Sequence, residues 1–285
     1  MTSPTMSVAE AIRTRRTVRH YRPDPVPRAT LDALLDLAVE APTSWNLQDR
    51  SIVAVLSDEG RAGLAWATGG QPQPQEAPVV LVFVAEPQAW RDDHSDVHEQ
   101  ARRSGAWNDE FIEMFSAASR AFQKDLDQRG LLREYAVKDA VIAASFVMLA
   151  ATEMGLATSP MNGWDEAKVK KVIGIAGRDD LAIALLVSVG YPAEGRRHPG
   201  RRARERNVFR ESYGAGGAGD RGIDVVRARS RPAVREGGPA FGRSPWRVGR
   251  QWGMRRAGRV TSSSRNSAIR EWTWRMRWVS SMRSR

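Results

Sequence analysis

The sequence predicts a layered domain of helices and strands over residues 1–214. Two fully apolar runs, residues 78–85 and 181–191, are rich in aliphatic side chains, which is typical of strands buried on both faces. Stretches with helical periodicity lie before and between them. Buried strands that alternate with helices indicate an α+β or α/β domain, and 285 residues are enough for a sizeable core.

The N-terminal segment predicts two helices. Ser7 and Glu10 have the spacing of a capping box, which begins a short helix that ends in an Arg cluster. Apolar residues then recur at helical spacing over residues 31–38, which predicts an amphipathic helix that stops before Pro42.

The remaining elements follow from the same patterns. A strand is predicted over residues 51–56, and helices are predicted over residues 59–67, 107–128, 132–154 and, after the N-cap Asp165, to about residue 173. The helix over 132–154 is nearly apolar all round, so we expect it at the centre of a core or of an interface. Residues 86–106 are polar and are expected to be irregular.

The composition excludes several classes of site and location. The chain has no Cys, which excludes disulfides, thiolate metal sites, iron–sulfur clusters and a Cys nucleophile. The N-terminus has no apolar run before a small-residue cleavage site, so no secretory signal is expected. The apolar runs over 140–151 and 181–189 are shorter than the roughly 18–20 residues of a membrane span. We therefore expect a soluble cytoplasmic protein.

The charge is concentrated at the C-terminal end. Residues 215–285 hold 17 of the 44 basic residues, all of them Arg, but only four of the 33 acidic residues. This segment has a net charge of +13, whereas residues 1–214 have a net charge of −2. The overall charge of +11 therefore carries no information about the part that is predicted to fold.

We expect the segment over 215–285 to be disordered, because it has no sustained apolar period and is rich in Arg, Gly and Ser. Its Arg and Trp residues fit nucleic-acid binding or an anionic membrane surface. The hypothesis that we favour is a frameshift near Gly214, since Arg without Lys is typical of a GC-rich gene translated in a wrong frame. Residues 214–219 match G-x-G-x-x-G but lack the strand and helix of a dinucleotide site.

Four segments of residues 1–214 carry candidate binding residues. Near the first helix, Arg15, Arg16 and Arg19 surround Thr17, and clustered guanidinium groups bind phosphate well. The alternative is that these Arg residues only favour a helix C-terminus electrostatically. The fourth segment, residues 196–202, ends in Arg201 and Arg202 and would close on the same phosphate, unless it is a solvated loop.

The second and third segments carry amide and hydroxyl groups. Residues 41–48 place two hydroxyls and two carboxamides before a strand, and carboxamides both donate and accept at the edge of a heteroaromatic ring. Residues 159–165 (SPMNGWD) contain a Gly that lets the backbone approach a ligand closely. The alternatives are a polar turn and a turn before a capped helix. His94 and His98 lack a clear third ligand, so a flexible acidic loop is expected and no metal site is predicted.

In this order, the four segments resemble the FMN-dependent nitroreductase family, over about residues 7–214. The matching pieces are RTRRTVRHYRPDPVP, APTSWNLQ, SPMNGWD and VGYPAE followed by basic residues. Within the family the chain looks closest to a subgroup of NAD(P)H nitroreductases, several of them linked to quinones. The resemblance implies an α+β fold with a central mixed sheet wrapped by helices, in an intertwined homodimer that shares two FMN sites.

The resemblance also implies which residues bind FMN. Those for the phosphate and the ribityl chain are Arg15, Arg16, Thr17 and Arg19, with Arg201 and Arg202 completing the phosphate site. Those in the loop that reaches the flavin, often from the partner chain, are Thr43, Ser44, Asn46 and Gln48. Those along the ring are Pro160, Met161, Asn162 and Gly163, where an N–H of Asn162 or Gly163 would donate to flavin N5.

Three features depart from the family pattern. One is the last basic segment, where a Lys that is common in the family is not evident and His198 or Arg197 stands as a poor substitute. Many members have an acidic residue where this chain has Asn162, and the family loop usually continues as Gln-Pro where this chain has Gln48-Asp49. The resemblance implies an oxidoreductase that uses NADH or NADPH in a ping-pong cycle to reduce nitroaromatics, quinones or similar acceptors. No side chain is expected to be catalytic. The alternatives are a non-catalytic flavin-binding protein and nucleic-acid binding through the basic tail.

Overall fold

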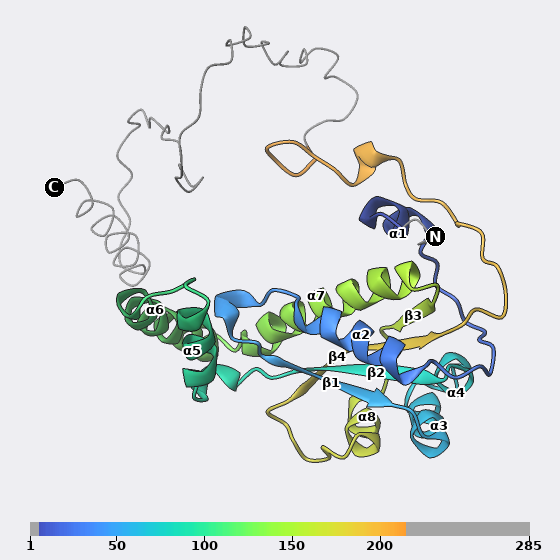
Figure 1. The fold of residues 1–285 in the computed structure, drawn as a ribbon, viewed down its shortest axis with the longest axis horizontal. Coiled ribbons are helices and arrows are strands. Elements are labelled where there is room, and N and C mark those ends of the chain that lie inside the picture. The colour runs from blue at the N-terminus through green and yellow to red at the C-terminus, as the bar shows by residue number, and fades with distance from the viewer. Residues whose placement is uncertain (1–5, 215–285) are drawn as a thin grey trace, which may run out of the picture. The chain divides into compact units, whose positions relative to one another are not determined.

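The computed structural model describes residues 6–214 (Figure 1). It divides into two units, Met1–Pro199 and Gly200–Arg285, which are described separately here. The expectations for 215–285, namely disorder, a frameshift and nucleic-acid or membrane binding, lie outside the described residues. In the second unit the described part runs to Gly214 and contains one 3-10 turn, Arg204–Arg206.

The first unit is built on a four-stranded sheet with the order β1-β2-β4-β3. Its strands are β1 (Arg50–Val55), β2 (Val79–Ala85), β3 (Ala157–Met161) and β4 (Ala182–Gly190). Each neighbouring pair is antiparallel, which corrects the expected mixed sheet within the described part of the chain. A parallel contact is present only as an isolated bridge between Thr17 and Thr158.

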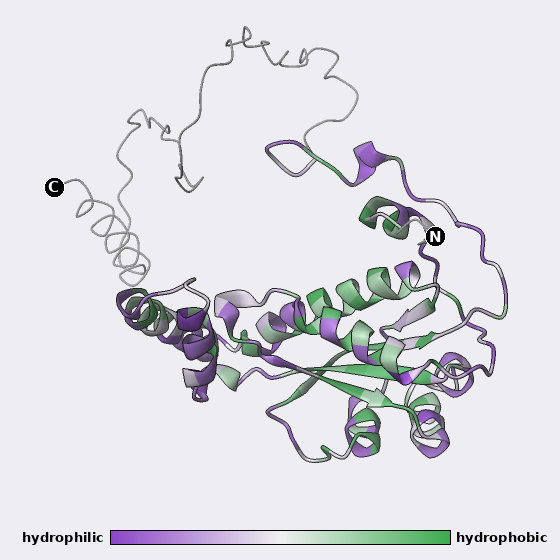
Figure 2. Ribbon diagram, in the orientation of Figure 1, coloured by the Kyte–Doolittle hydropathy of each residue, from purple (hydrophilic) through white to green (hydrophobic). Residues whose placement is uncertain are grey.

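Helices cover both faces of this sheet (Figure 1). On one face lie α2 (Arg28–Val39) and α7 (Leu132–Glu153), and on the other lie α3 (Asp58–Ala67) and α8 (Glu166–Val172). Alternate residues of β2 enter the two cores, and every residue of β2 and β4 is buried, as predicted for both strands. The two central strands, β2 and β4, are accordingly the most apolar part of the sheet (Figure 2).

The N-terminal helix α1 (Val8–Thr14) has the predicted capping box. Ser7 Oγ accepts from the backbone N–H of Glu10 at 3.2 Å, and Glu10 Oε2 accepts from the N–H of Ser7 at 2.8 Å. The other helices of this unit are α4 (Gln73–Glu76), α5 (Ser95–Arg103), α6 (Asp109–Gln128) and the 3-10 turns Ser44–Asn46 and Ala89–Arg91.

The prediction of irregular structure over 86–106 is wrong, because α5 lies within it. No residue of α5 is buried, so the helix has no apolar stripe to reveal it in the sequence. Glu99 instead forms ion pairs with Arg102 and Arg103, which are spaced to stabilise a helical turn. His94 and His98 therefore lie at and within a helix and not in a flexible loop.

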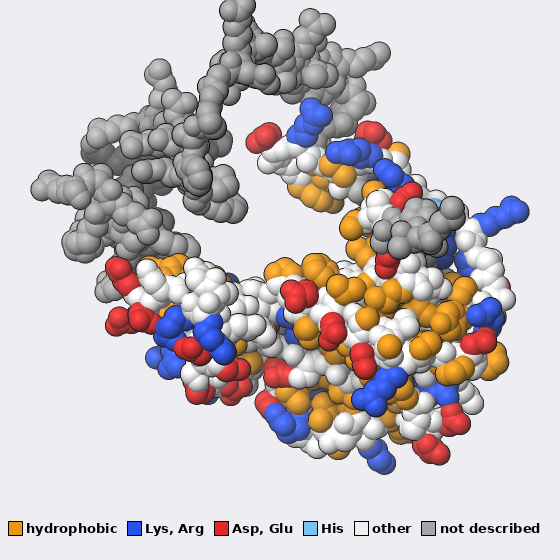
Figure 3. Space-filling view, viewed as in Figure 1, with side chains coloured by type: hydrophobic (Ala, Val, Ile, Leu, Met, Phe, Trp, Pro, Cys, Tyr) orange, Lys and Arg blue, Asp and Glu red, His pale blue; other side chains and the backbone are white. Residues whose placement is uncertain are grey.

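Helix α7 is the central helix of the unit. By length and composition alone, the whole helix would be able to cross a membrane. Only its apolar run over 140–151, which is too short for a span, was considered from the sequence. In this fold it packs against β2, β4 and α2. Beside its buried side it carries the exposed Phe146, and α2 adds the exposed Leu37 and Val39, so apolar side chains gather on this surface (Figure 3).

Candidate functional site

The Arg cluster follows the C-terminal end of α1, where Arg15 is the C-cap. Arg16 Nη1 donates to the carbonyls of Arg13 and Arg15 at 2.6 and 2.9 Å, which holds this guanidinium against the helix end. Its Nε is buried and has no hydrogen-bond partner among the described residues. Arg15 Nη1 lies 3.5 Å from Thr17 Oγ1, and Arg19 is exposed. The cluster thus offers several donors to an anion.

The chain after the cluster pairs with β3. Thr17 bridges Thr158, and the N–H of Val18 donates to the carbonyl of Thr158 at 3.1 Å. From Thr158 the strand runs on toward Asn162, and four residues of extended chain span roughly 13 Å. The structure therefore connects the first and third predicted segments, so that one elongated ligand would reach both.

Beyond Met161, the last residue of β3, the chain leaves the sheet. Pro160 is half-buried and Met161 is buried, whereas Asn162 and Gly163 are exposed. The segment is held in place because the Gln71 side-chain amide donates to the carbonyl of Gly163 at 3.4 Å. The strand itself was not predicted, since proline is rare within sheets. Pro160 is tolerated because β3 is an edge strand.

The predicted residues of the second segment lie in a turn, residues 43–48, which we call the 43–48 loop. The backbone N–H of Gln48 donates to Thr43 Oγ1 at 2.9 Å. Three residues have left-handed φ values, namely Trp45 (56°), Asn46 (49°) and Gln48 (51°). Such values are costly for residues other than Gly and persist only where the surroundings impose them.

Asp139 of α7 forms hydrogen bonds with Ser44, the residue directly before Trp45. Its Oδ2 accepts from the N–H of Ser44 at 2.8 Å and its Oδ1 accepts from Ser44 Oγ at 3.2 Å. Asp139 was not among the residues predicted from the sequence. The signal was present, because Asp139 is an acidic residue within the nearly apolar helix and is 4% exposed.

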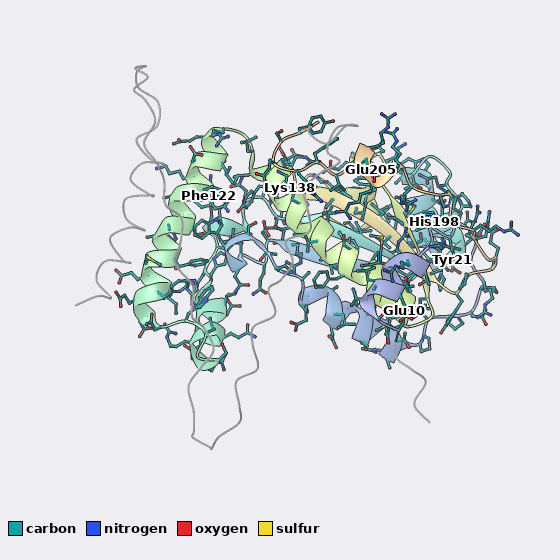
Figure 4. The ribbon with its side chains drawn as sticks, turned by 90° about the horizontal axis from the view of Figure 1, so that it is seen from above. Glu10, Tyr21, Phe122, Lys138, His198 and Glu205 are labelled. Carbon is teal, nitrogen blue, oxygen red and sulfur yellow. The ribbon has the colours of Figure 1, made fainter. Side chains whose placement is uncertain are left out.

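The loop and the Arg cluster lie toward opposite ends of α7. Figure 4 shows Lys138, the neighbour of Asp139, near α6, whereas Glu10 of α1 lies at the other end of α7. The predicted residues of the first unit therefore form two groups within one chain, with the 43–48 loop apart from the cluster and β3. The expectation that the loop comes from the partner chain stays a prediction.

Aromatic side chains surround the 43–48 loop. The Trp45 ring lies 5.0 Å from the Phe115 ring and 5.7 Å from the Phe122 ring, both on α6. Beside them is a pocket of about 250 Å³, lined among others by Trp45, Asn46, Trp90, His98, Trp107 and Phe115. This pocket was not predicted from the sequence, because most of its lining residues belong to the segment expected to be irregular and to a helix for which no site was predicted.

Buried charge lies beneath the same loop. Asp49 is 3% exposed, and burial, with repulsion from Asp139, raises its pKa to about 7. Burial also lowers the pKa of Arg50. The Arg50 side chain donates through Nη2 to the carbonyls of Val39 and Ala41, at 3.1 and 2.6 Å.

Two further predicted features are located as follows. Arg201 and Arg202 belong to the second unit and are exposed, and Arg201 Nη1 donates to the carbonyl of Gly200 at 2.7 Å. Their phosphate role stays a prediction. His98 Nε2 lies 3.4 Å from Ser116 Oγ, and the described residues contain no group of three His, Cys, Asp or Glu suited to a metal ion.

The sequence profile of the Nitroreductase family matches residues 12–191. A protein named "NADH dehydrogenase" from Thermus thermophilus is 33% identical over 196 residues, which cover 68% of this chain and 90% of that protein. "Putative NAD(P)H nitroreductase MhqN" from Bacillus subtilis is 26% identical over 175 residues, covering 61% and 83%. The fold is similar, with a TM-score of 0.61, to a "putative nitroreductase in complex with FMN" from Exiguobacterium sibiricum, at 21% identity and covering 70% and 95%.

Proposed function

The chain is a member of the nitroreductase family of NAD(P)H- and FMN-dependent oxidoreductases, and from that premise we propose that it binds FMN and reduces electron-poor acceptors. The reductant is NADH or NADPH in a ping-pong cycle, and the acceptors are nitroaromatics, quinones or similar compounds. The observation that carries the proposal is the pairing of the Arg cluster with β3, which leads from a phosphate-binding group to the exposed Asn162 and Gly163.

The residues present fit FMN. Arg16 Nε is a buried donor that lacks a partner in the described part of the chain, as expected where a phosphate oxygen would accept. Arg15 and Arg16 offset the phosphate charge, and the Thr17 hydroxyl adds a donor. When bound, FMN supplies the hydride chemistry of the reaction. The N–H groups of Asn162 or Gly163 orient the ring, and no side chain of this chain acts as acid or base because solvent supplies the proton.

A homodimer completes each site in this proposal. The Arg cluster and the 43–48 loop lie toward opposite ends of α7, so a second chain packed in the opposite direction along α7 would bring its loop to the first chain's cluster. The exposed apolar residues Leu37, Val39 and Phe146 on α2 and α7 favour such an interface. In the assembled site, Ser44 and Asn46 of the loop would contact the flavin.

The aromatic pocket beside Asn46 supports a flat acceptor. Its lining of Trp and Phe rings suits an aromatic or quinonoid molecule, which would stack on these side chains.

We place the reaction in the cytoplasm and in a domain that spans residues 1–214, with residues 215–285 dispensable. A nucleic-acid-binding role would depend on those last residues.

The test is the visible absorption spectrum of the purified full chain and of residues 1–214, recorded before and after NADPH is added. We expect flavin bands that bleach on reduction in both proteins. Flavin bands that bleach with neither NADPH nor NADH would indicate a non-catalytic flavin-binding protein. The absence of flavin from both proteins, even after incubation with FMN, would contradict the proposal.

A further inference from the structure

Two buried carboxyl groups lie beneath the 43–48 loop. Asp139 accepts both the N–H and the hydroxyl of Ser44, as described above. Asp49 follows the loop directly, and its backbone carbonyl accepts from the N–H of Glu86 at 2.9 Å, which fixes its main chain. Its Oδ1 is buried and has no hydrogen-bond partner among residues 6–214. Asp49 is thus an almost fully buried acid without a cation bound to it in the described chain.

The surroundings disfavour a second negative charge at this point. Asp139 and Tyr135 approach from α7, and Glu86, at the end of β2, repels Asp49 from the other side. Arg50 is the cation that faces Asp49, but its guanidinium is directed to backbone carbonyls, and its Nη1 is buried with no partner in the described residues. A proton on Asp49 therefore removes the repulsion between the two buried acids, and both oxygens of Asp139 accept from Ser44.

We propose that Asp139 is a positioning residue for the cofactor-binding loop, and that a proton on the neighbouring Asp49 keeps this anchor in place. This inference rests on the proposed FMN binding. The loop needs an anchor because Trp45, Asn46 and Gln48 all have left-handed φ values, which relax when the restraining contact is lost. Ionisation of Asp49 adds a buried negative charge beside Asp139, and the two side chains then repel each other. Because Asp139 is hydrogen-bonded to Ser44, its displacement moves Ser44 and Asn46 away from the ligand.

The sign of the pH dependence follows from the pKa of Asp49. This pKa is raised above its ordinary value, so the folded chain binds the proton more tightly than the unfolded chain does. The free energy of unfolding therefore decreases as the pH rises from about 4 to about 7, and this contribution is constant above that range. The affinity for FMN is expected to be highest below about pH 7 and to fall above it.

The experiment measures the dissociation constant of FMN by quenching of flavin fluorescence, with the full chain, from pH 5.5 to 9. We expect affinity to weaken about tenfold across the titration of Asp49, the effect of coupling by one pKa unit. Asp49→Asn should abolish this step. The FMN phosphate also titrates near pH 6 but does so equally in both proteins, so their difference isolates Asp49. Asp36→Asn, on the exposed side of α2, is the matched control and should follow the wild type.

Asp139→Asn tests the anchor. This substitution keeps the size of the side chain but replaces a carboxyl acceptor with an amide, so the affinity for FMN should fall about tenfold at every pH. The decrease in affinity that accompanies ionisation of Asp49 should also occur at lower pH, because the repulsion from Asp139 is removed. A second readout needs no flavin: thermal unfolding of the apoprotein between pH 4 and 7 should lose its Asp49-dependent slope in Asp49→Asn.

The outcomes separate this inference from the proposed function. FMN that binds with the same pH profile in wild type and Asp49→Asn overturns the inference and leaves FMN binding established. Failure to bind FMN at any pH overturns the proposed function itself. If Asp49→Asn does not fold, the affinity of the wild-type protein for riboflavin is measured as a function of pH, because riboflavin has no phosphate group that titrates. A riboflavin affinity that is constant from pH 6 to 9 then overturns the inference.

Discussion

The two groups of proposed ligand-binding residues, toward opposite ends of α7, differ in their structure. At the Arg cluster the groups are exposed or half-buried cations, and the main chain is an ordinary strand bridge between Thr17 and Thr158. At the 43–48 loop the backbone is in unusual conformations, and a buried acid, Asp139, restrains it from below. The first end is suited to attract charge, whereas the second is suited to hold a fixed shape. Removal of charged side chains should therefore have its largest effect at the Arg cluster. Changes in packing or protonation should have their largest effect at the 43–48 loop.

The largest effect is expected at the Arg cluster. Arg15→Ala with Arg16→Ala should raise the dissociation constant of FMN by roughly two to four orders of magnitude, since each hydrogen bond to a charged group contributes about 1.5–3 kcal/mol. FMN retention after gel filtration measures this loss. Arg28→Ala, whose side chain on α2 is 94% exposed, is the control. An unchanged yield of flavin-loaded protein would show that the phosphate binds elsewhere.

A smaller effect is expected at the other end from Trp45→Ala. The Trp45 ring contacts Phe115 and Phe122, and aromatic pairs contribute about 0.5–1.5 kcal/mol each beyond their buried area. The free energy of unfolding should fall by about 2 kcal/mol, which urea denaturation measures. A variant with wild-type stability would mean that Asp139 alone determines the loop conformation.

The smallest effect is expected at Gly163. A Cβ atom added there would meet no atom within 4 Å, so Gly163→Ala should change the free energy of unfolding by less than about 0.5 kcal/mol. Gly190→Ala is the comparison, because its Cβ would lie 2.5 Å from Pro78 Cδ and should destabilise the sheet by about 1–3 kcal/mol. Equal unfolding midpoints for the two variants would contradict this assignment.

Elements with a strong local signal were predictable from the sequence. The capping box at Ser7 and Glu10, the fully apolar strands and the long apolar helix were each predicted within one or two residues. The two missed elements have different causes. Helix α5 is stabilised by local ion pairs in place of an apolar face, so it has no hydrophobic periodicity to predict it. Strand β3 depends on β4, which is distant in the sequence, and on its place at the sheet edge.

The candidate site divides in the same way. Arg15, Arg16 and Asn162 were predicted from motifs whose residue types carry the chemistry directly. Asp139 was not predicted, because its proposed role depends on its hydrogen bonds to Ser44. Ser44 is 95 positions away in the sequence and becomes a neighbour only in the fold. Asp49 was noted as a departure from the family pattern, but its burial beside a second acid became visible only in the folded chain.

The position of β3 has a consequence for the behaviour of the protein at high concentration. An edge strand presents unpaired backbone groups to which a strand of another molecule can add, and this is a common start of aggregation. Here Val18 occupies the carbonyl of Thr158, and Pro160 has no N–H to offer an incoming strand. The strand that carries Pro160 and Met161 thus also discourages the addition of a further strand along its open edge.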